Sequence, residues 1–358
     1  AKMDSIPIVA ITGQVASTLL GSDAFQETDI MGATFPLVKH SYMIQNVEEI
    51  PRIIHEAFHI ARSGRPGPVL IDIPKNIQQQ EGIADFHVSF DCPSYKPNLK
   101  PSVLQCKKAA HTIQTAKRPI IYAGGGIISS GASEELRAFA KKTGIPVTTT
   151  AMGLGAFPSN DPLSLRMLGM HGAVYANIAI NHADLVIAMG VRFDDRVTGK
   201  LAEFCKNAQF IQIDIDPTEI NKNITIDVPI QGDVKQALKI LTGYVEPKKD
   251  IKPWVKQVNE WKKEFPLEFE LKKGEIVPQS VVSDINKLAA KDAIFSVGVG
   301  QHQMWAAQFL DFDMPNNWLC SSGLGAMGFG LPAAMGAQVA FPNRQVINIE
   351  GDGSFLMN

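Results

Sequence analysis

Short runs of apolar residues recur along the chain, and most are followed by a glycine-rich loop and a segment with helical spacing. These runs are rich in Val and Ile and lie at residues 6–12, 68–73, 119–123, 184–189, 210–215, 293–297 and 346–349. Strands that are buried on both faces of a parallel sheet have such continuous apolar sequences. Their alternation with helical segments predicts βαβ units and therefore an α/β fold.

Two stretches of different composition interrupt this alternation and are interpreted as linkers. Residues 78–102 contain three consecutive glutamines and several prolines, and residues 247–278 are rich in lysine, with a helical pattern at 254–265. They divide the chain into three successive parallel-sheet α/β domains, expected at 1–90, 91–250 and 251–358. A strand begins close to Ala1 and a glycine-rich turn lies just before Asn358, so we expect the first and last domains to be truncated.

Composition narrows the class of protein. Apolar residues make up 45% of the 358 positions, enough for several packed cores, and the formal net charge is only -2 with no basic run. This balance argues against nucleic acid and against an anionic membrane as partners, and no apolar run is long enough to span a bilayer. The four cysteines form no CxxC pair, which is typical of reduced thiols rather than of a zinc knuckle or a disulfide framework.

One helical segment carries a motif that is typical of zinc proteases. Residues 55–59 read His-Glu-Ala-Phe-His, in which two histidines one turn apart could hold zinc beside a glutamate base. The surrounding pattern favours a crossover helix that ends near Gly64. Its apolar face comprises Ile53, Ile54, Ala57, Phe58, Ile60 and Ala61, and its polar face comprises Arg52, His55, His59 and Arg62, with Glu56 at the margin. We therefore expect both histidines to face water.

The C-terminal segment contains the most informative motif. An apolar run is followed by Asp352, which lies between two glycines, and then by Ser354. Asp352 could offer a hard oxygen to Mg²⁺, while Gly353 and Ser354 could bind a diphosphate, although an ordinary Gly-Asp-Gly turn remains an alternative. Two glycine-rich stretches lie upstream, at 296–305 and 321–332, where a bulky ligand could approach the backbone closely. Small residues that allow tight helix–sheet packing are the alternative there.

The middle segment has its own set of strand-end loops. Gly124, Gly125 and Gly126 follow one predicted strand, residues 190–196 follow the next, and Asp214 and Asp216 follow a third. Glycines and acids at several strand ends of one parallel sheet favour a nucleotide at its carboxyl edge. No strict GxGxxG occurs, so a nicotinamide-type fingerprint is not supported, and turns or helix caps remain the alternative at each position.

Taken together, the C-terminal loops resemble the diphosphate-binding domain of thiamine-diphosphate enzymes. Several further blocks are similar to the acetolactate synthase family in particular. The most unusual strings are Met-Leu-Gly-Met-His-Gly at 167–172 and Gly-Val-Arg-Phe-Asp-Asp-Arg at 190–196. Others lie at 13–15, 23–28, 63–69, 73–75 and 300–305, in the family's order over essentially the whole chain.

The resemblance implies three cofactors: thiamine diphosphate, Mg²⁺ and FAD. The metal ligand would be Asp352, and thiamine diphosphate would contact Val299, Gly300, Gln301, His302, Gly325, Met327, Gly353 and Ser354. FAD, largely without redox use, would contact Arg65, Gly125, Gly126, Thr150, Met152, His171, Gly190, Val191, Arg192, Asp194, Asp214 and Asp216. The active site would be lined by Gln26 and Lys75, and Arg196 would receive the carboxylate of the second substrate through bidentate pairing.

The family's reaction decarboxylates pyruvate on thiamine diphosphate and ligates the hydroxyethyl unit to a second pyruvate or to 2-oxobutyrate. The resemblance also implies a homodimer or homotetramer, a possible small regulatory subunit, and a bacterial cytoplasmic or plastid stromal location. The family's activating glutamate and second metal ligand would lie outside residues 1–358. Glu27 is not that glutamate, because it belongs to the block at 23–28. We therefore expect this chain alone to lack activity. Pyruvate oxidase, glyoxylate carboligase and a non-catalytic FAD-binding protein are the alternatives.

Overall fold

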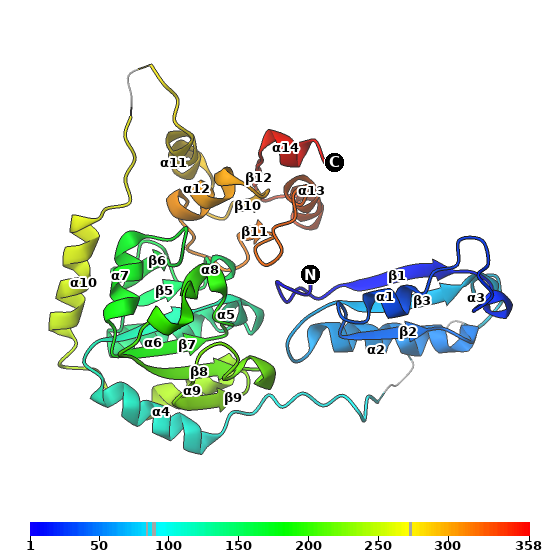
Figure 1. Ribbon diagram of the computed structural model, residues 1–358, viewed down its shortest axis with the longest axis horizontal. Helices are drawn as coiled ribbons and strands as arrows, with labels where there is room; N and C mark the ends of the chain where they lie inside the picture. The colour runs from blue at the N-terminus through cyan, green and yellow to red at the C-terminus, as the bar shows by residue number, and fades with distance from the viewer. Residues whose placement is uncertain (84, 88–90, 272–273) are drawn as a thin grey trace. The chain divides into compact units, whose positions relative to one another are not determined.

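The structure is a computed structural model, and it describes residues 1–83, 85–87, 91–271 and 274–358. Part of the first predicted linker, residues 84 and 88–90, lies outside the described residues, as do residues 272 and 273 of the second. The chain divides into two compact units, residues 1–98 and 99–358, each described by itself below. Figure 1 shows the elements of both units.

The first unit contains a three-stranded parallel sheet in the order β1-β3-β2. Its strands are β1 (Val9–Gln14), β2 (His40–Met43) and β3 (Val69–Pro74), and its helices are α1 (Ile30–Thr34), α2 (Ile50–Arg62) and α3 (Lys75–Gln78). The small core lies between the central strand and α2, where Ile53, Ala57 and Ile60 meet Val69 and Ile71. Burial of each of these isoleucine and valine side chains contributes about 1.5–3 kcal/mol.

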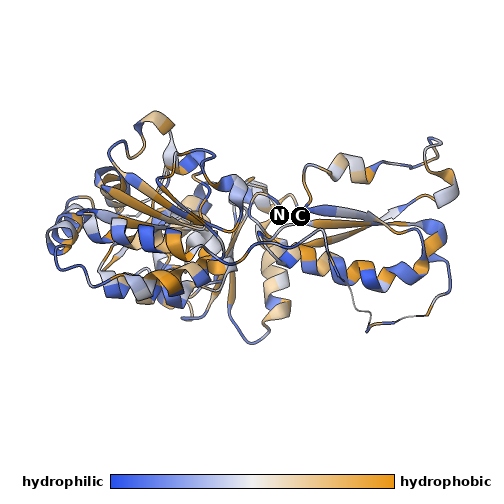
Figure 2. Cartoon of the chain, turned by 90° about the horizontal axis from the view of Figure 1, so that it is seen from below, coloured by the Kyte–Doolittle hydropathy of each residue, from blue (hydrophilic) through white to orange (hydrophobic). Residues whose placement is uncertain are grey.

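The second unit begins with a six-stranded sheet, entirely parallel, in the order β6-β5-β4-β7-β8-β9. The strands are β4 (Pro119–Ala123), β5 (Val147–Thr149), β6 (Ser164–Met167), β7 (Leu185–Met189), β8 (Gln209–Asp214) and β9 (Val228–Gln231). The helices are α4 (Val103–Thr115), α5 (Gly125–Ser129), α6 (Ser133–Thr143), α7 (Val174–His182), α8 (Asp195–Thr198), α9 (Val234–Tyr244) and α10 (Lys252–Glu264). Figure 2 shows strands of this unit that are mostly hydrophobic, whereas its helices carry both hydrophobic and hydrophilic positions. This is the pattern of a sheet covered by amphipathic helices.

A second sheet in the same unit has three parallel strands in the order β11-β10-β12. They are β10 (Ile294–Val297), β11 (Trp318–Cys320) and β12 (Val346–Ile349), accompanied by α11 (Pro278–Leu288), α12 (Gln301–Phe309), α13 (Gly330–Ala340) and α14 (Asp352–Phe355). The three parallel sheets along the chain confirm the predicted α/β class. In the part of the chain that the structure describes, no helix has the length and apolar character needed to cross a membrane.

The second predicted linker needs correction over its first half. Helix α10 packs against the middle sheet: Trp254 and Val258 are buried in the same core as Ile120 and Ile121, and the Trp254 indole Nε1–H donates to the carbonyl of Pro119 at 2.9 Å. Three of the lysines that suggested a linker, Lys252, Lys256 and Lys263, occupy the exposed side of this amphipathic helix. Composition alone missed this because the apolar positions are few and spaced three or four apart. The domain limits at 90 and 250 remain predictions.

The sequence analysis also missed five strands, namely β2, β5, β6, β9 and β11. All five are only three or four residues long, so each contains too few apolar positions to form a clear run. Strand β9 even contains Pro229, which is tolerated because an edge strand has one unpaired side.

Candidate cofactor and active sites

The middle sheet places its glycine loops at the point where the strand order reverses. Strand β4 is the first strand of this sheet in sequence, and it lies between β5 and β7. Strands β5 and β6 are added on one side of it, and strands β7, β8 and β9 on the other. In open α/β sheets, ligands bind in the crevice at the carboxyl ends of the two strands that flank this point. The loops that follow β4 and β7 are 124–126 and 190–192, which are the loops that the sequence selected.

These two loops contact each other through their backbones. The amide of Gly124 donates to Met189 O at 3.0 Å, and the amide of Gly126 donates to Gly190 O at 3.2 Å. A Cβ on Gly124 would lie 2.3 Å from Gly190 O, and one on Gly126 would lie 2.6 Å from the Cα of Gly190. Gly190 itself has a φ of +61°, which favours glycine. A side chain at these positions would push the crevice walls apart.

Two further predicted residues lie on the same edge. Thr150 follows β5, and its amide donates to Ala123 O at 3.0 Å, while Met152 contacts the position where Gly125 would carry a Cβ, at 3.1 Å. The Thr150 hydroxyl is buried and has no hydrogen-bond partner among the described residues. An unpartnered buried hydroxyl beside a glycine cradle fits a site that is completed by a polar ligand.

The acids at this edge are partly engaged in local structure. Asp194 accepts from the Arg196 amide at 3.0 Å as the cap of α8 and pairs with Arg192 at 2.6 Å. Asp214 accepts from the amide of Asp216 at 2.9 Å, and Asp216 accepts from the amide of Thr218 at 3.0 Å. The helix-cap alternative therefore holds for Asp194, whereas the carboxylate of Asp214, at the end of β8, is buried close to the edge.

A residue that the sequence analysis did not select lies beneath this edge. Tyr122 of β4 is fully buried, and its hydroxyl has no hydrogen-bond partner among the described residues. Burial raises the pKa of this hydroxyl, and the nearby Asp194 carboxylate raises it further. Because Tyr122 lies within an apolar run, the sequence indicated only a core residue. No local sequence pattern indicated that its hydroxyl would be buried without a partner.

The two unusual sequence blocks lie against each other. The amide of Met170 donates to Arg196 O at 2.8 Å, and Gly169, with a φ of +96°, packs on Val197. The carbonyl of His171 accepts from Gln308 of α12 at 2.8 Å. The Arg196 guanidinium is exposed and pairs with Asp195 at 2.6 Å, which raises the pKa of the arginine. Because an exposed pair of this kind is weak, an anionic ligand could replace Asp195 as the partner.

The smaller sheet brings together all three C-terminal glycine loops. Its parallel strands end at Val297, Cys320 and Ile349, so the loops 298–302, 321–328 and 350–354 leave from one edge. The hydroxyl of Ser354 accepts from the Gly328 amide at 2.9 Å, and a Cβ on Gly353 would lie 3.3 Å from Met327 Cε. A Cβ on Gly325 would lie 3.6 Å from Val299 Cγ1. The predicted thiamine residues thus come from three loops that touch one another.

Two buried polar atoms within these loops have no hydrogen-bond partner among the described residues. They are Nε2 of His302 and Oε1 of Glu350. The His302 ring lies against Gly300 and Gly351, where added Cβ atoms would come within about 3 Å of it, and Glu350 occupies the space beside Gly298 and Gly330. The glycines and the unpartnered imidazole fit a diphosphate, because backbone approach and a spare donor are what phosphate oxygens require. Glu350 was not selected from the sequence, although it directly precedes the Gly-Asp-Gly turn.

Asp352, the predicted metal ligand, begins α14 and is exposed. The described residues include no group of three or more His, Cys, Asp or Glu side chains placed to hold a metal ion. A single carboxylate fits Mg²⁺ bound together with phosphate oxygens and water, which is its usual coordination in nucleotide and diphosphate sites. It does not fit a cage built from protein ligands alone.

In the first unit, Gln26 lies on the loop after β1 and Lys75 begins α3 after β3, so both follow the carboxyl ends of strands. Lys75 follows β3 directly and is exposed. Gln26 is exposed with a φ of +63°, an uncommon backbone conformation for a residue other than glycine. Its neighbour Glu27 holds the loop, accepting from the amides of Gly21 at 2.5 Å and Ala24 at 2.9 Å, and these bonds lower the pKa of its carboxyl. Arg65 also lies in this unit, where it donates to the Ser5 hydroxyl at 2.9 Å.

The His-Glu-Ala-Phe-His segment lies on α2 as predicted, with His55 and His59 exposed and Gly64 at φ +60° after the helix. The predicted apolar face is wrong at one margin, because Phe58 is 54% exposed whereas Glu56 is only 7% exposed. Glu56 is buried because it accepts from Arg52 at 2.8 Å and from the Tyr42 hydroxyl at 3.1 Å. A carboxylate held in this way is not available as a catalytic base between two histidines.

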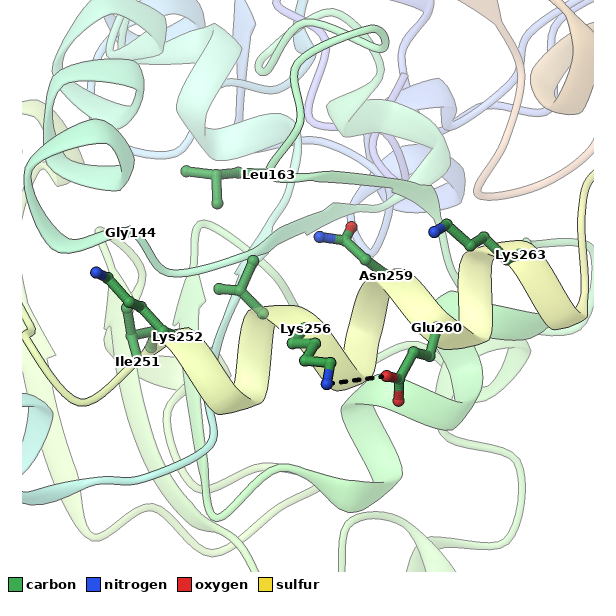
Figure 3. A pocket seen from close by; sticks show the side chains of 9 residues that line it. Gly144, Leu163, Ile251, Lys252, Lys256, Asn259, Glu260 and Lys263 are labelled. Atoms are coloured by element: carbon green, nitrogen blue, oxygen red, sulfur yellow. Dashed lines mark ion pairs between the residues drawn. The ribbon is translucent and has the colours of Figure 1, made fainter.

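A groove of about 550 Å³ runs along α10 (Figure 3). Lys252, Lys256 and Lys263 line it, with Glu260 paired to Lys256 at 3.8 Å. The groove reaches Gly144 and Leu163, which precede β5 and β6, so it lies at the amino edge of the middle sheet. Ligands of open parallel sheets bind at the opposite, carboxyl edge, and none of the predicted site residues lines this groove.

Comparison with known proteins is consistent with this geometry. The central domain of thiamine pyrophosphate enzymes matches residues 106–241, and their C-terminal TPP binding domain matches residues 298–358. These segments contain the middle sheet and the smaller sheet, respectively. Over both segments the chain is therefore similar to the thiamine pyrophosphate enzymes.

Curated proteins that are similar to the chain over its whole length include several acetolactate synthases. The chain is 52% identical to acetolactate synthase 1, chloroplastic, of Oryza sativa subsp. japonica, 51% identical to acetolactate synthase, chloroplastic, of Arabidopsis thaliana, and 48% identical to acetolactate synthase of Mycobacterium bovis. Each alignment covers 100% of this chain and, respectively, 56%, 54% and 59% of the relative. The chain thus spans a little over half the length of these relatives.

Proposed function

We propose that this protein is an acetolactate synthase, which condenses two 2-oxo acids with loss of CO₂. The observation that carries the proposal is the alignment of the entire chain, at 48–52% identity, with acetolactate synthases of plants and a bacterium. The geometry supports it through two separate glycine-lined cradles, one on the middle sheet and one on the smaller sheet. Two pyruvates would give acetolactate and CO₂, and pyruvate with 2-oxobutyrate would give the homologous hydroxy acid.

The smaller sheet would bind thiamine diphosphate. Val299, Gly300, Gln301 and His302 would surround the cofactor from the β10 loop, Gly325 and Met327 from the β11 loop, and Gly353 and Ser354 from the β12 loop, with Mg²⁺ on Asp352. When bound, the cofactor supplies the electron sink that decarboxylation of a 2-oxo acid requires. The protein would supply binding: the unpartnered Nε2 of His302, when protonated, would donate to an anionic oxygen, and the glycines would let backbone amides come close.

The middle sheet would bind FAD at its switch point. Gly125 and Gly126 would face the pyrophosphate, with Gly190 to Arg192 on the facing loop and Asp214 in reach of a ribose hydroxyl. Thr150, Met152, His171, Asp194, Asp216 and Arg65 complete the proposed flavin set. The support for a large polar ligand is the buried, unpartnered hydroxyl of Thr150 beside the glycine contact.

Three residues are proposed to act on the substrates. The Arg196 guanidinium would leave Asp195 and bind the carboxylate of the acceptor 2-oxo acid through two parallel hydrogen bonds. Gln26 and Lys75 are proposed to line the active site. The proposed acceptor is pyruvate or 2-oxobutyrate, because both present the same carboxylate and keto group to Arg196.

The proposed assembly is a homodimer or homotetramer, which a small regulatory subunit could join. The proposed location is the bacterial cytoplasm or the plastid stroma. The support for the location is the relatives themselves, which include plant proteins named as chloroplastic and one from a bacterium.

The test is a product assay on the full-length protein. It is incubated with pyruvate and FAD, with and without thiamine diphosphate and Mg²⁺, and acetolactate, acetaldehyde and hydrogen peroxide are quantified. We expect acetolactate that depends on thiamine diphosphate and Mg²⁺, and we expect Asp352→Asn to abolish it. The same change at the exposed Asp284 of α11, Asp284→Asn, should leave it unchanged. Peroxide would instead indicate a pyruvate oxidase, and condensation of glyoxylate without acetolactate would indicate a glyoxylate carboligase. Stoichiometric flavin without any thiamine-dependent product would indicate a non-catalytic flavin protein.

A further inference from the structure

A fully buried carboxylate stands in the central strand of the first unit. Asp72 has no exposed surface, and it interrupts the otherwise apolar sequence Val-Leu-Ile-Asp-Ile of β3. Burial of a charged group lowers stability unless hydrogen bonds compensate, and an aliphatic side chain at this position would usually be at least as stabilising. A carboxylate here therefore calls for a role other than core packing.

The two oxygens of Asp72 accept hydrogen bonds from two side chains of the neighbouring strand. Oδ1 accepts from the Thr12 hydroxyl at 2.8 Å, and Oδ2 accepts from the Gln14 amide at 3.1 Å. Thr12 stands directly opposite Asp72 in the β1–β3 register, and Gln14 is two residues further along β1. The Gln14 side chain is itself buried, with 9% of its surface exposed.

Gln14 extends this contact to the loop that carries Gln26. Its Nε2 also donates to the carbonyl of Thr28 at 2.8 Å, and its Oε1 accepts from the Val15 amide at 2.8 Å. The carboxylate accepts only, so it fixes the orientation of the Gln14 amide with its nitrogen toward both Asp72 and Thr28. The bridge thus runs from β3 through Gln14 to the backbone two residues after Gln26.

We propose that Asp72, acting through Gln14, is a positioning residue that holds the Gln26 loop in register with the end of β3, where Lys75 lies. This proposal rests on the proposed function, in which Gln26 and Lys75 line the active site. Asp72 lies on β3, which ends at Pro74 immediately before Lys75. The link from Asp72 through Gln14 therefore positions the Gln26 loop relative to the strand that leads into Lys75. Misplacement of a positioned group by about 1 Å can cost roughly 100-fold in rate.

The test compares Gln14→Met with Thr12→Val in the full-length protein. Gln14→Met keeps the shape of the side chain and removes the bridge. Thr12→Val is the matched control, because it removes one hydrogen bond from the same buried carboxylate and leaves the link to Thr28 intact. We measure the melting temperature, kcat and KM for pyruvate, and backbone hydrogen exchange over residues 21–29.

We expect kcat of Gln14→Met to fall about 10- to 100-fold relative to Thr12→Val at a similar melting temperature, with faster exchange over residues 21–29. Asp72→Asn should keep most of the rate, because its carbonyl oxygen can still accept from Gln14 while its amide donates to the Thr12 hydroxyl. Asp72→Leu should reproduce the loss. If Gln14→Met does not fold, Gln14→Asn replaces it, since the shorter side chain cannot reach Asp72 and Thr28 together.

Equal kcat and equal exchange for Gln14→Met and Thr12→Val would overturn the proposal, as would a loss in Asp72→Asn as large as that in Asp72→Leu. The exchange measurement needs no substrate, so it separates the two hypotheses. A wild-type protein that makes no acetolactate, with residues 21–29 still released by Gln14→Met, would refute the proposed function and leave the bridge. Acetolactate formation that is insensitive to Gln14→Met would support the proposed function and refute the positioning role of Asp72 and Gln14.

Discussion

Gly124→Ala is the sharpest test of the flavin crevice. Gly124 has φ −114° and ψ −172°, so alanine meets no backbone strain of its own there. The added Cβ would lie 2.3 Å from Gly190 O and 2.6 Å from Val191 Cγ1. A relaxed carbon–oxygen contact is about 1 Å longer than the first of these, so the β4 and β7 loops would have to separate by a comparable amount.

The energetic cost follows from the contacts that this separation breaks. Forcing one extra carbon into a packed site typically costs 1–3 kcal/mol. Because Gly190 O also accepts from the Gly126 amide, its displacement weakens a hydrogen bond that contributes about 1 kcal/mol. We therefore expect a loss of about 3 kcal/mol, equivalent to a melting temperature lower by about 6–10 °C in a unit of this size.

The assay is thermal unfolding combined with flavin retention in the purified protein. A wider crevice should also raise the Kd for FAD at least about tenfold, since loss of about 1.4 kcal/mol of contact suffices for that. Gly243→Ala is the matched control: it adds the same methyl group within α9, where nothing lies within 4 Å, and should be neutral or stabilising by up to about 1 kcal/mol. A Gly124→Ala protein with the melting temperature and flavin content of this control would refute the close contact of the two loops.

Three further predictions address other parts of the chain. Asp352→Asn should weaken Mg²⁺-dependent thiamine diphosphate binding at least about tenfold without lowering the melting temperature, because the carboxylate is exposed. Calorimetric titration measures the binding, and thermal unfolding measures the melting temperature. Burial raises the pKa of the Cys205 thiol from 9.0 to about 12. The folded state therefore holds this proton more tightly than the unfolded state, and the associated stability is complete below pH 9 and is lost as the pH rises toward 12. Cys205→Ala should make the alkaline fall in melting temperature shallower, and an unchanged slope would contradict this. Replacement of both His55 and His59 by alanine should leave the zinc content and the activity unchanged, as measured by elemental analysis and the acetolactate assay; loss of stoichiometric zinc would restore the metalloprotease hypothesis.

The sequence by itself determined the α/β class and the central strands. Strands buried on both faces must be continuously apolar, and that requirement is visible in residues 119–123 and 185–189 without any structure. It also marked the glycine loops, because a glycine after an apolar run has few purposes other than a turn, close packing or close approach to a ligand. The edge strands and α10 carried weaker patterns, since only part of their surface is buried.

Only the tertiary structure decided which of these loops meet. The sequence separates Gly126 from Gly190 and Gly298 from Glu350 by more than 50 residues each, and the strand order is what brings each pair together. Tertiary packing also decided that Glu56 rather than Phe58 faces inward on α2, because Arg52 and Tyr42 supply hydrogen bonds that a helical wheel does not contain. The bridge from Asp72 through Gln14 to Thr28 was hidden for the same reason: hydrogen bonds between distant residues depend on strand register, and no local pattern encodes it.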